Sequence, residues 1–523
     1  MVFKIKNEYK LTILILIFYL CWIAFWIMDT LSDLIDLLSY GDKKEFLAFQ
    51  KKKNKRHDVK NIRLFDLLET DDIKYREKIY LSAKNKDAYH ALRKRLQDNL
   101  LLFLSQKTFE SSNSEAYEAL RLLVVSRFLL ENNLAKIAFK CLVKAEKIAI
   151  GLEQFSLLNE ILLLRLQFAH LNTSENLEAL TEKFLVNQSQ MQREAKLHMA
   201  YAFLRQELED VHLKSKVIHL ADVITKTIKK YHIAVQDWMT YKSLYQILFI
   251  ANEYAAIHQN YDLIESYIRK TYSFIQSRTE TTHYHLFYHL SILYYLANFN
   301  LRSKNFSASK HYLEQMMHLM EHKRYKSLFY LRHQLLLALN SHYSGKPQEA
   351  IEVLYSALAS ANNKSKQEDV DDLRLCLTMF LAQHNDDTCL RQLAKFTHSD
   401  AWYEKKLGML WTIRKNLMEI LIHTQFENSE LAMSRMKSFK RRYMKYLHAT
   451  KEQRVVDFVL LVEKYLFRPD IVFKEDFQNT VLNMLHTTEN KDIFNLSFIG
   501  WVLAQWEKKT PYEVTLKLVN KLQ

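Results

Sequence analysis

Glycine and proline are scarce in this chain, which has 5 and 3 of them among 523 residues. Average usage would give roughly 37 and 26. A strand-rich fold needs glycine for turns with positive φ and proline for loops, so a fold with many tight hairpins is excluded. Leu, Lys, Glu, Ala and Gln fill long uninterrupted runs instead, and these residues favour helix. The composition predicts an all-α fold.

Cysteine is also scarce, and the four residues are Cys21, Cys141, Cys376 and Cys389. They are scattered and form no CxxC pair, so no disulfide framework is predicted. Free thiols are typical of a reducing compartment, which favours a cytoplasmic body. The five glycines are equally dispersed, which excludes a Walker A loop and a G-x-G-x-x-G fingerprint. No cofactor is predicted.

Long apolar runs are absent except near the start, where residues 11–28 carry no charged side chain until Asp29. As a helix they would extend about 27 Å, enough for a thin bilayer core. Basic residues precede them and no small-x-small cleavage site follows, which favours an uncleaved inner-membrane anchor over a removed signal peptide. Alternatively, Met28 is the true start and the protein is soluble and cytoplasmic. Residues 1–28 are thus either a single anchor or a mis-extended N-terminus.

Positive charge is concentrated in two places within a chain of formal net charge +15. Residues 42–63 hold nine Lys or Arg against three acids, and residues 435–454 hold eight against one. Such a run is either a solvated helix face or a surface for nucleic acid or anionic lipid. No short glycine-containing turn of a helix-turn-helix accompanies the first run, so nucleic acid is not the favoured partner. The candidate basic surface comprises Lys51, Lys52, Lys53, Lys55 and Arg56.

One string of basic and apolar positions between residues 43 and 96 is distinctive. It comprises Lys43, Lys44, Phe46, Phe49, Lys53, Asn54, Lys55, Arg56, Lys60, Leu64, Phe65, Leu68, Tyr89, His90, Leu92, Arg93, Lys94, Arg95 and Leu96. This string resembles the N-terminal signature of uncharacterised bacterial proteins with tetratricopeptide-like (TPR-like) helical repeats. The resemblance covers roughly residues 30–105 and implies an all-helical fold with no known activity. An upstream anchor is not part of that signature, which favours Met28 as the start.

A repeat becomes visible beyond Ser111, and residues 331–357 are its clearest unit. Gly345 marks the turn between two helices, and small residues are needed where antiparallel helices cross closely. Armadillo and HEAT repeats share the period of about 42 residues, but the turn at Gly345 favours TPR-like pairs. The small position of the second helix recurs at Ala138, Ala179, Ala221, Leu263, Ala308, Ala350, Leu390 and Ala432.

The predicted architecture is a right-handed α-solenoid of TPR-like helix pairs. Residues 29–110 form a basic N-terminal helical region, and residues 111–469 form the repeats. Residues 470–523 are amphipathic but less regular, as is typical of helices that cap the open end of a stack.

One catalytic motif is present, because His318, Glu321 and His322 match the H-x-x-E-H pattern of inverted zinc proteases. It lies in a second helix between repeats of consistent length, so we interpret it as a chance match among 21 histidines. His285 and His289 lie four residues apart, and we interpret them as repeat-surface residues rather than metal ligands. We predict neither a metal site nor an enzyme.

TPR-like solenoids bind proteins or peptides on the concave side, which the first helices line. Amides and Arg suit an extended backbone or a carboxylate, and aromatic rings hold apolar anchors. The leading hypothesis is therefore a non-catalytic scaffold that binds a protein or peptide in this groove. The alternative is a peptide-sensing regulator whose basic N-terminal region contacts nucleic acid. The groove-facing positions given by the repeat register are Tyr245, Asn252, Asn300, Arg332, His342 and Tyr343.

Overall fold

All regular structure in the described part of the chain is helical, which confirms the all-α prediction. The apolar segment 11–28 lies outside that part. Among the described helices, none is both long and apolar enough to cross a membrane. The computed structural model describes residues 31, 34–35, 37–53, 60–69, 86–111, 115–172, 175–214, 220–233, 240–258, 265–276, 285–321, 325–362, 365–450, 452–485 and 492–521.

The chain divides into two compact units. Unit 1 comprises residues 1–149 with 167–174, and unit 2 comprises residues 150–166 with 175–523. The boundary predicted after residue 110 falls inside unit 1, and the boundary predicted after residue 469 falls inside unit 2.

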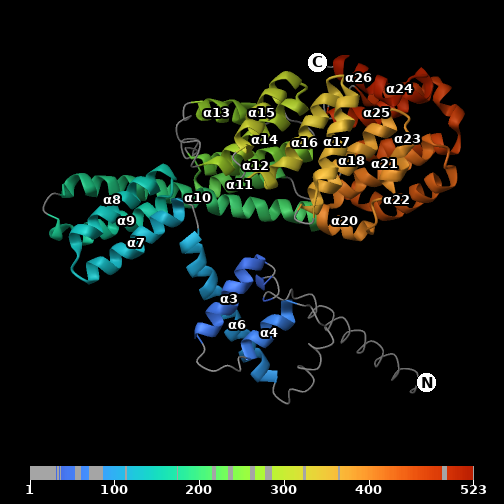
Figure 1. The fold of residues 1–523 in the computed structure, drawn as a ribbon. Coiled ribbons are helices and arrows are strands. Elements are labelled where there is room, and N and C mark those ends of the chain that lie inside the picture. Colours follow the sequence, from blue (N-terminus) through green and yellow to red (C-terminus); the bar gives the residue numbers. More distant parts are fainter. Residues whose placement is uncertain are drawn as a thin grey trace, which may run out of the picture. The chain divides into compact units, whose positions relative to one another are not determined.

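Three helices near the N-terminus pack around one small core, and Figure 1 shows them in blue. They are α3 (Tyr40–Lys53), α4 (Lys60–Glu69) and α6 (Lys86–Ser111). Each contributes a phenylalanine, since the ring centre of Phe46 lies 5.2 Å from that of Phe65 and 5.4 Å from that of Phe103. This core belongs to unit 1 alone.

Unit 1 also contains the first helix pair, α7 (Glu115–Glu131) and most of α8 (Ala135–Gly151). Ala138 is fully buried where the two helices cross. The hydroxyl of Ser126 donates to the carbonyl of Leu122 and also lies 3.3 Å from that of Ala138. Small side chains therefore let these backbones approach closely, as the repeat pattern predicts.

Unit 2 contains the other α-helices of the described residues. They are α9 (Phe155–Gln167), α10 (Leu177–Lys214), α11 (Leu220–Tyr231), α12 (Tyr241–His258), α13 (Glu265–Gln276), α14 (Leu286–Arg302), α15 (Phe306–Met320), α16 (Lys326–Tyr343), α17 (Pro347–Ser360), α18 (Gln367–Gln383), α19 (Thr388–Leu393), α20 (Asp400–Leu407), α21 (Met409–Gln425), α22 (Ser429–Ala449), α23 (Gln453–Phe467), α24 (Glu475–Met484), α25 (Ile493–Glu507) and α26 (Pro511–Lys521).

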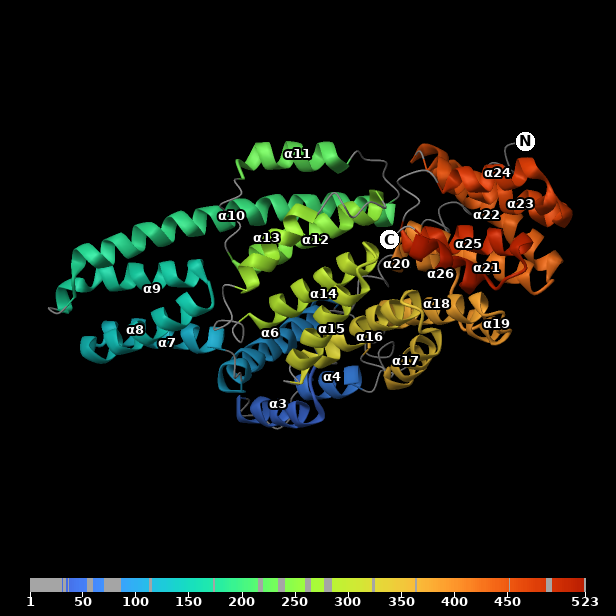
Figure 2. The same ribbon diagram turned by 90° about the horizontal axis from the view of Figure 1, so that it is seen from above.

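Within unit 2, one helix of each pair packs against the corresponding helix of the next pair. Helices α10, α12, α14, α16, α18 and α21 are neighbours in that order, and we call them the first-helix layer. Helices α11, α13, α15, α17, α19 and α22 follow them as second helices. Helix α10 also packs against α20 and α21, and Figures 1 and 2 both show its end beside α20. The first-helix layer therefore curves back on itself.

The turns that follow the first helices α14, α16, α18 and α21 share one backbone geometry. A residue with positive φ ends the first helix, and the next amide donates to a carbonyl five residues earlier. Lys304, Gly345, Asn385 and Glu427 occupy this position, roughly 40 residues apart. Only Gly345 among the four is a glycine. This turn therefore forms with other residues too, which is consistent with the low glycine content of the chain.

The predicted register of small positions is correct at some crossings and wrong by one residue at others. Ala350 and Ala432 are fully buried, like Ala138. Ala308 and Leu390 are only half-buried. The fully buried small residues there are Ser309 and Cys389, and Ser309 donates its hydroxyl to the carbonyl of Ala297.

A similar shift occurs at Ala179, which is exposed while its neighbour Leu180 is buried. Leu263 lies outside the described residues, as does the side chain of Ala221. Helix α10 departs further from the repeat, because its 38 residues run without a turn through a second helix and the next first helix. Gln, Met, Arg, Glu, Ala and Lys fill its middle, and none of these breaks a helix.

Candidate peptide-binding face

Four first helices carry a stripe of polar and aromatic side chains along one face. Two positions on each stripe lie 7, 11, 11 or 14 residues apart, close to two, three, three and four helical turns. We call the surface formed by these stripes the inner face. The paired positions are Tyr295 and Arg302 in α14, Arg332 and Tyr343 in α16, Asp372 and Gln383 in α18, and Trp411 and Gln425 in α21.

The C-terminal halves of these stripes are covered by α25 and α26, which we call the C-terminal hairpin. Arg302 forms an ion pair with Asp492, just before α25, and its guanidinium lies 4.2 Å from the ring centre of Phe494. The hydroxyls of Tyr343 and Ser497 are 2.8 Å apart. These contacts close the covered half of the inner face over α14 and α16.

The hairpin covers α18 and α21 in the same way. The indole N–H of Trp501 donates to the side-chain oxygen of Gln425 at 2.8 Å. Gln425 in turn donates to the carbonyl of Ala382, at the end of α18. Tyr512 of α26 donates its hydroxyl to the carbonyl of His342. One hairpin therefore joins four consecutive first helices.

This cover corrects the placement of two predicted groove residues. His342 is fully buried, its ring centre lies 3.6 Å from that of Phe380, and its Nε2 donates to the side-chain oxygen of Gln383 at 2.7 Å. Tyr343 is only 1% exposed. Asn300 is buried for another reason, because it points into the helix packing and donates to the carbonyl of Leu296 in its own helix. The register assigned Tyr343 to the inner face, but it could not reveal that another segment occupies the space above it.

The rest of the inner face, away from the hairpin contacts, is its open half, where hydrogen bonds link neighbouring first helices. Asn298 of α14 donates to the side-chain oxygen of Asn252 of α12 at 2.8 Å. Arg332 of α16 donates to Asp369 of α18 at 2.9 Å. The indole of Trp411 in α21 donates to Asp372 of α18, also at 2.8 Å. Two predicted residues, Asn252 and Arg332, are members of this ladder.

Tyr245, the third predicted residue in the open half, lies in a cluster of aromatic rings. Its ring centre is 5.9 Å from that of Phe287, 5.7 Å from Tyr288 and 6.3 Å from Tyr295. Burial raises the pKa of Tyr288 and Tyr295, so both keep their hydroxyl protons at neutral pH. All four side chains are half-buried, and the three tyrosines offer a hydroxyl as well as a ring face.

In the open half, Arg332 lies among the carboxylates of α18. Burial raises the pKa of Asp372 to about 6, and the neighbouring carboxylates Asp369 and Asp371 add to this rise. Arg332 opposes it, and its side chain remains 37% exposed. Arg332 is therefore held in place by Asp369 and still accessible to solvent, so it can receive a polar group of a ligand.

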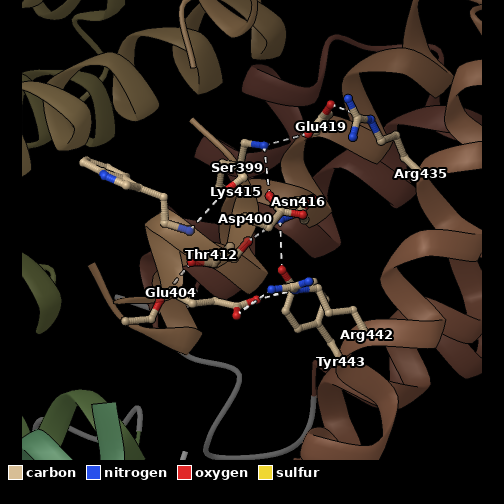
Figure 3. A network of polar contacts seen from close by, with 12 residues as sticks. Ser399, Asp400, Glu404, Thr412, Lys415, Asn416, Glu419, Arg435, Arg442 and Tyr443 are labelled. Carbon is tan, nitrogen blue, oxygen red and sulfur yellow. Dashed lines mark hydrogen bonds and ion pairs between the residues drawn. The ribbon is translucent and has the colours of Figure 1, made fainter. Parts of the chain in front are cut away.

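Figure 3 shows a second polar network, which joins α20, α21 and α22. Lys415 donates to Glu419 at 2.9 Å, and Glu419 also binds Arg435 at 2.8 Å. Arg442 binds both carboxylate oxygens of Glu404, at 2.5 and 2.8 Å. Every charge here has a partner within the network, so its role is to hold these helices together.

The two basic runs differ in the structure. Lys51, Lys52 and Lys53 of the first run are exposed at the end of α3, and Lys53 donates to Asn99 of α6. Lys55 and Arg56 lie outside the described residues. In the second run, Arg435, Lys440 and Arg442 pair with glutamates of neighbouring helices. Both runs therefore contain exposed cations, since Lys437, Arg441 and Lys445 of the second run are exposed as well.

The histidine motifs gain no further support as metal sites. His318 and Glu321 lie at the end of α15, and His322 is outside the described residues. His285 and His289 are buried rather than surface residues, which corrects their predicted placement, and His285 contacts the carbonyl of Gly151. In the described part of the chain, no three His, Cys, Asp or Glu side chains are arranged to hold a metal ion.

Sequence reasoning missed several members of the open half, namely Tyr295, Asn298, Asp369, Asp372 and Trp411. The available signal was the recurrence of polar or aromatic residues at whole-turn spacing along each first helix. The register search instead followed small residues of the second helices, which report on helix crossings.

Comparison with known proteins adds no functional assignment. No protein-family model matches the chain, and no curated protein matches it. The geometry of the inner face is therefore the basis for the functional argument.

Proposed function

We propose that unit 2 is a non-catalytic scaffold that binds a protein or peptide on the open half of its inner face. The fold class behind this proposal is a right-handed α-solenoid of TPR-like pairs with a period of about 42 residues. The regular turns at Lys304, Gly345, Asn385 and Glu427 support that period. The packing of successive first helices against each other also supports it.

The observation that carries the proposal is that the covered half of this face already holds a helical segment. Helix α25 is bound there by aromatic contact, an ion pair and side-chain hydrogen bonds. The open half offers the same kinds of group, namely tyrosine rings, amides and one accessible Arg. A second peptide segment is the natural ligand for a surface of this chemistry.

The proposal is tested with a triple variant, Tyr245→Phe, Asn252→Ala and Arg332→Ala, in the full chain. We expect an unchanged helical circular dichroism spectrum and the loss of specific partners from pull-downs in native cells analysed by mass spectrometry. The matched control changes Lys310→Ala and Glu352→Ala, which are exposed on second helices. Recovery of the same partners with the triple variant would place the binding surface elsewhere.

A second candidate function is contact with nucleic acid through the N-terminal helices, favoured by the exposure of Lys51, Lys52 and Lys53. Phosphate contacts make such binding strongly salt-dependent. Changing these three lysines to Gln should weaken binding to duplex DNA and reduce its salt dependence.

The control for that test has the same charge change on α22, where Lys437, Arg441 and Lys445 are all exposed. Fluorescence anisotropy at two salt concentrations measures both variants. Equal loss of binding in the two variants would mean that only net charge matters, and this candidate would then be rejected.

A further inference from the structure

Helix α8 of unit 1 exposes a face that combines positive charge with aliphatic side chains, and we call it the α8 basic face. Its members are all exposed and comprise Lys136, Ile137, Lys140, Val143, Lys144 and Lys147. At about 100° per residue, these six positions fall within about 120° of the helix circumference. The buried residues of α8, among them Ala138, Leu142 and Ala145, lie on the opposite side. The α8 basic face therefore points away from α7, against which α8 packs.

Most of the charge on this face is not neutralised by neighbouring side chains. Lys144 forms an ion pair with Glu118 of α7 at 2.6 Å. The lysines that have no ion-pair partner among the described residues are Lys136, Lys140 and Lys147. The one acidic residue of α8, Glu146, is buried on the other side of the helix. Three lysines without partners thus extend along about 16 Å of helix.

Aliphatic side chains at both edges of this row of lysines are the second observation. Ile137 is 52% exposed on one edge and Val143 is 53% exposed on the other. The exposed cations of α22 have no such neighbours, because every exposed residue between 437 and 445 is Lys, Arg or Ser. The α8 basic face therefore differs from a purely charged helix surface elsewhere in the same chain.

This combination matches the surface of an anionic lipid bilayer. Each lysine close to such a surface strengthens binding by about fivefold. Aliphatic side chains contribute by entering the boundary between the headgroups and the acyl chains. A nucleic-acid backbone would attract the lysines as well, but it offers nothing to Ile137 and Val143, and the face has no Arg or aromatic side chain for base contacts.

We propose that α8 binds an anionic membrane surface through its basic face. The lysines contact the headgroups, and Ile137 and Val143 enter the interface between them. This inference does not depend on the proposed function, since the residues that carry it belong to unit 1 and the proposed peptide-binding face belongs to unit 2.

Sedimentation of the full chain with lipid vesicles tests this proposal. One set of vesicles is pure phosphatidylcholine, and the other contains about one-third phosphatidylserine, which makes its surface anionic. We expect the affinity for the anionic vesicles to be at least tenfold higher. Any contribution of the apolar segment 11–28 is shared by both vesicle types, so the ratio of the two affinities isolates the effect of charge.

Two matched variants locate this effect on the chain. The test variant changes the three lysines without partners, by Lys136→Gln, Lys140→Gln and Lys147→Gln. The control variant removes the same charge from exposed positions of α22, by Lys437→Gln, Arg441→Gln and Lys445→Gln. We expect the preference for anionic vesicles to fall at least fivefold in the test variant and to stay within twofold in the control variant.

A third variant distinguishes lipid from nucleic acid. Ile137→Ser with Val143→Ser keeps every charge and should weaken binding to anionic vesicles at least threefold. No preference for anionic vesicles, or an equal loss in the test and control variants, would overturn the proposal. Full vesicle binding by the serine variant would also overturn it, and loss of duplex DNA binding in the lysine variant would then assign the face to nucleic acid.

Discussion

The two halves of the inner face have similar residues on the same helices but different surroundings. In α16, Arg332 and Tyr343 share one stripe, yet the Arg332 side chain is 37% exposed and Tyr343 is 1% exposed. The difference arises from Ser497 and Phe494 of α25, which lie about 150 residues further along the chain. Whether a stripe residue is available to a ligand is therefore decided by a distant segment and not by its own helix.

The covered half depends on the close packing of α25 against α26. A substitution of Gly500 is expected to disturb this packing most strongly. A Cβ at this position would lie 2.5 Å from the hydroxyl oxygen and 3.2 Å from the Cα of Thr515 in α26. Since backbone must move to relieve this overlap, Gly500→Ala should destabilise unit 2 by about 3 kcal/mol, at the upper end for overpacking.

Urea unfolding followed by circular dichroism measures this loss. Gly41→Ala is the control, because a Cβ there would lie 3.8 Å from the hydroxyl oxygen of Ser39, an ordinary contact. Unchanged stability of Gly500→Ala would mean that α26 is not held against α25 as described.

A pair of tyrosines compares the two halves directly. Tyr343→Phe removes a hydroxyl that is buried against Ser497 and should cost about 1–1.5 kcal/mol. Tyr245→Phe removes a hydroxyl from the half-buried cluster and should cost about 0.5 kcal/mol or less. Thermal melts of the two variants give the comparison. An equal loss of stability in the two variants would show that cover by the hairpin does not increase the contribution of a tyrosine hydroxyl to stability.

Much of this arrangement follows from the sequence. The shortage of Gly and Pro predicted helices, and the spacing of Ala138, Ala350 and Ala432 predicted crossings that are indeed fully buried. Arg332 and Tyr343 were both predicted to face a groove, but Tyr343 is buried under α25. The cover could not be predicted, because the repeat pattern contains nothing that relates α25 to helices more than 150 residues earlier. Periodicity within a short stretch of sequence predicts contacts between adjacent helices, whereas the contacts of the hairpin join residues far apart in the sequence.

Acidification should affect the two halves in opposite directions. Burial lowers the pKa of His342 to about 3, so between pH 6.5 and 3 the unfolded chain gains a proton that the folded chain does not, and stability falls. Burial raises the pKa of Asp372 to about 6, so the folded chain gains its proton first and stability rises between pH 6 and 3.8.

Each effect, of the order of 1 kcal/mol, is isolated by a variant that cannot titrate. Urea unfolding from pH 7.5 to 4.5 should show a shallower acid loss for His342→Gln than for the natural protein. Asp372→Asn should be more stable than the natural protein at pH 7.5, with the advantage shrinking below pH 6. Parallel curves for all three proteins would contradict the assignment.

The smallest effect is expected at the exposed cation of the open half. Arg332→Gln breaks the contact with Asp369, but a partly exposed ion pair contributes only about 0.5 kcal/mol. A change in melting temperature of about 2 °C or less is therefore expected for this variant. A large loss of stability would mean that Arg332 is a structural residue, and the open half would then have no cation to spare for a ligand.

The hairpin also sets the timing of folding on the ribosome. Arg302 pairs with Asp492, and Tyr343 contacts Ser497, so these partners are 190 and 154 residues apart. At translation rates of about 5–20 residues per second, the covered half waits roughly 8–40 seconds for its cover after α16 has been made. During that interval the nascent chain exposes a groove lined by Tyr343 and His342. That surface is exposed to solvent before it becomes part of the interior of the folded protein.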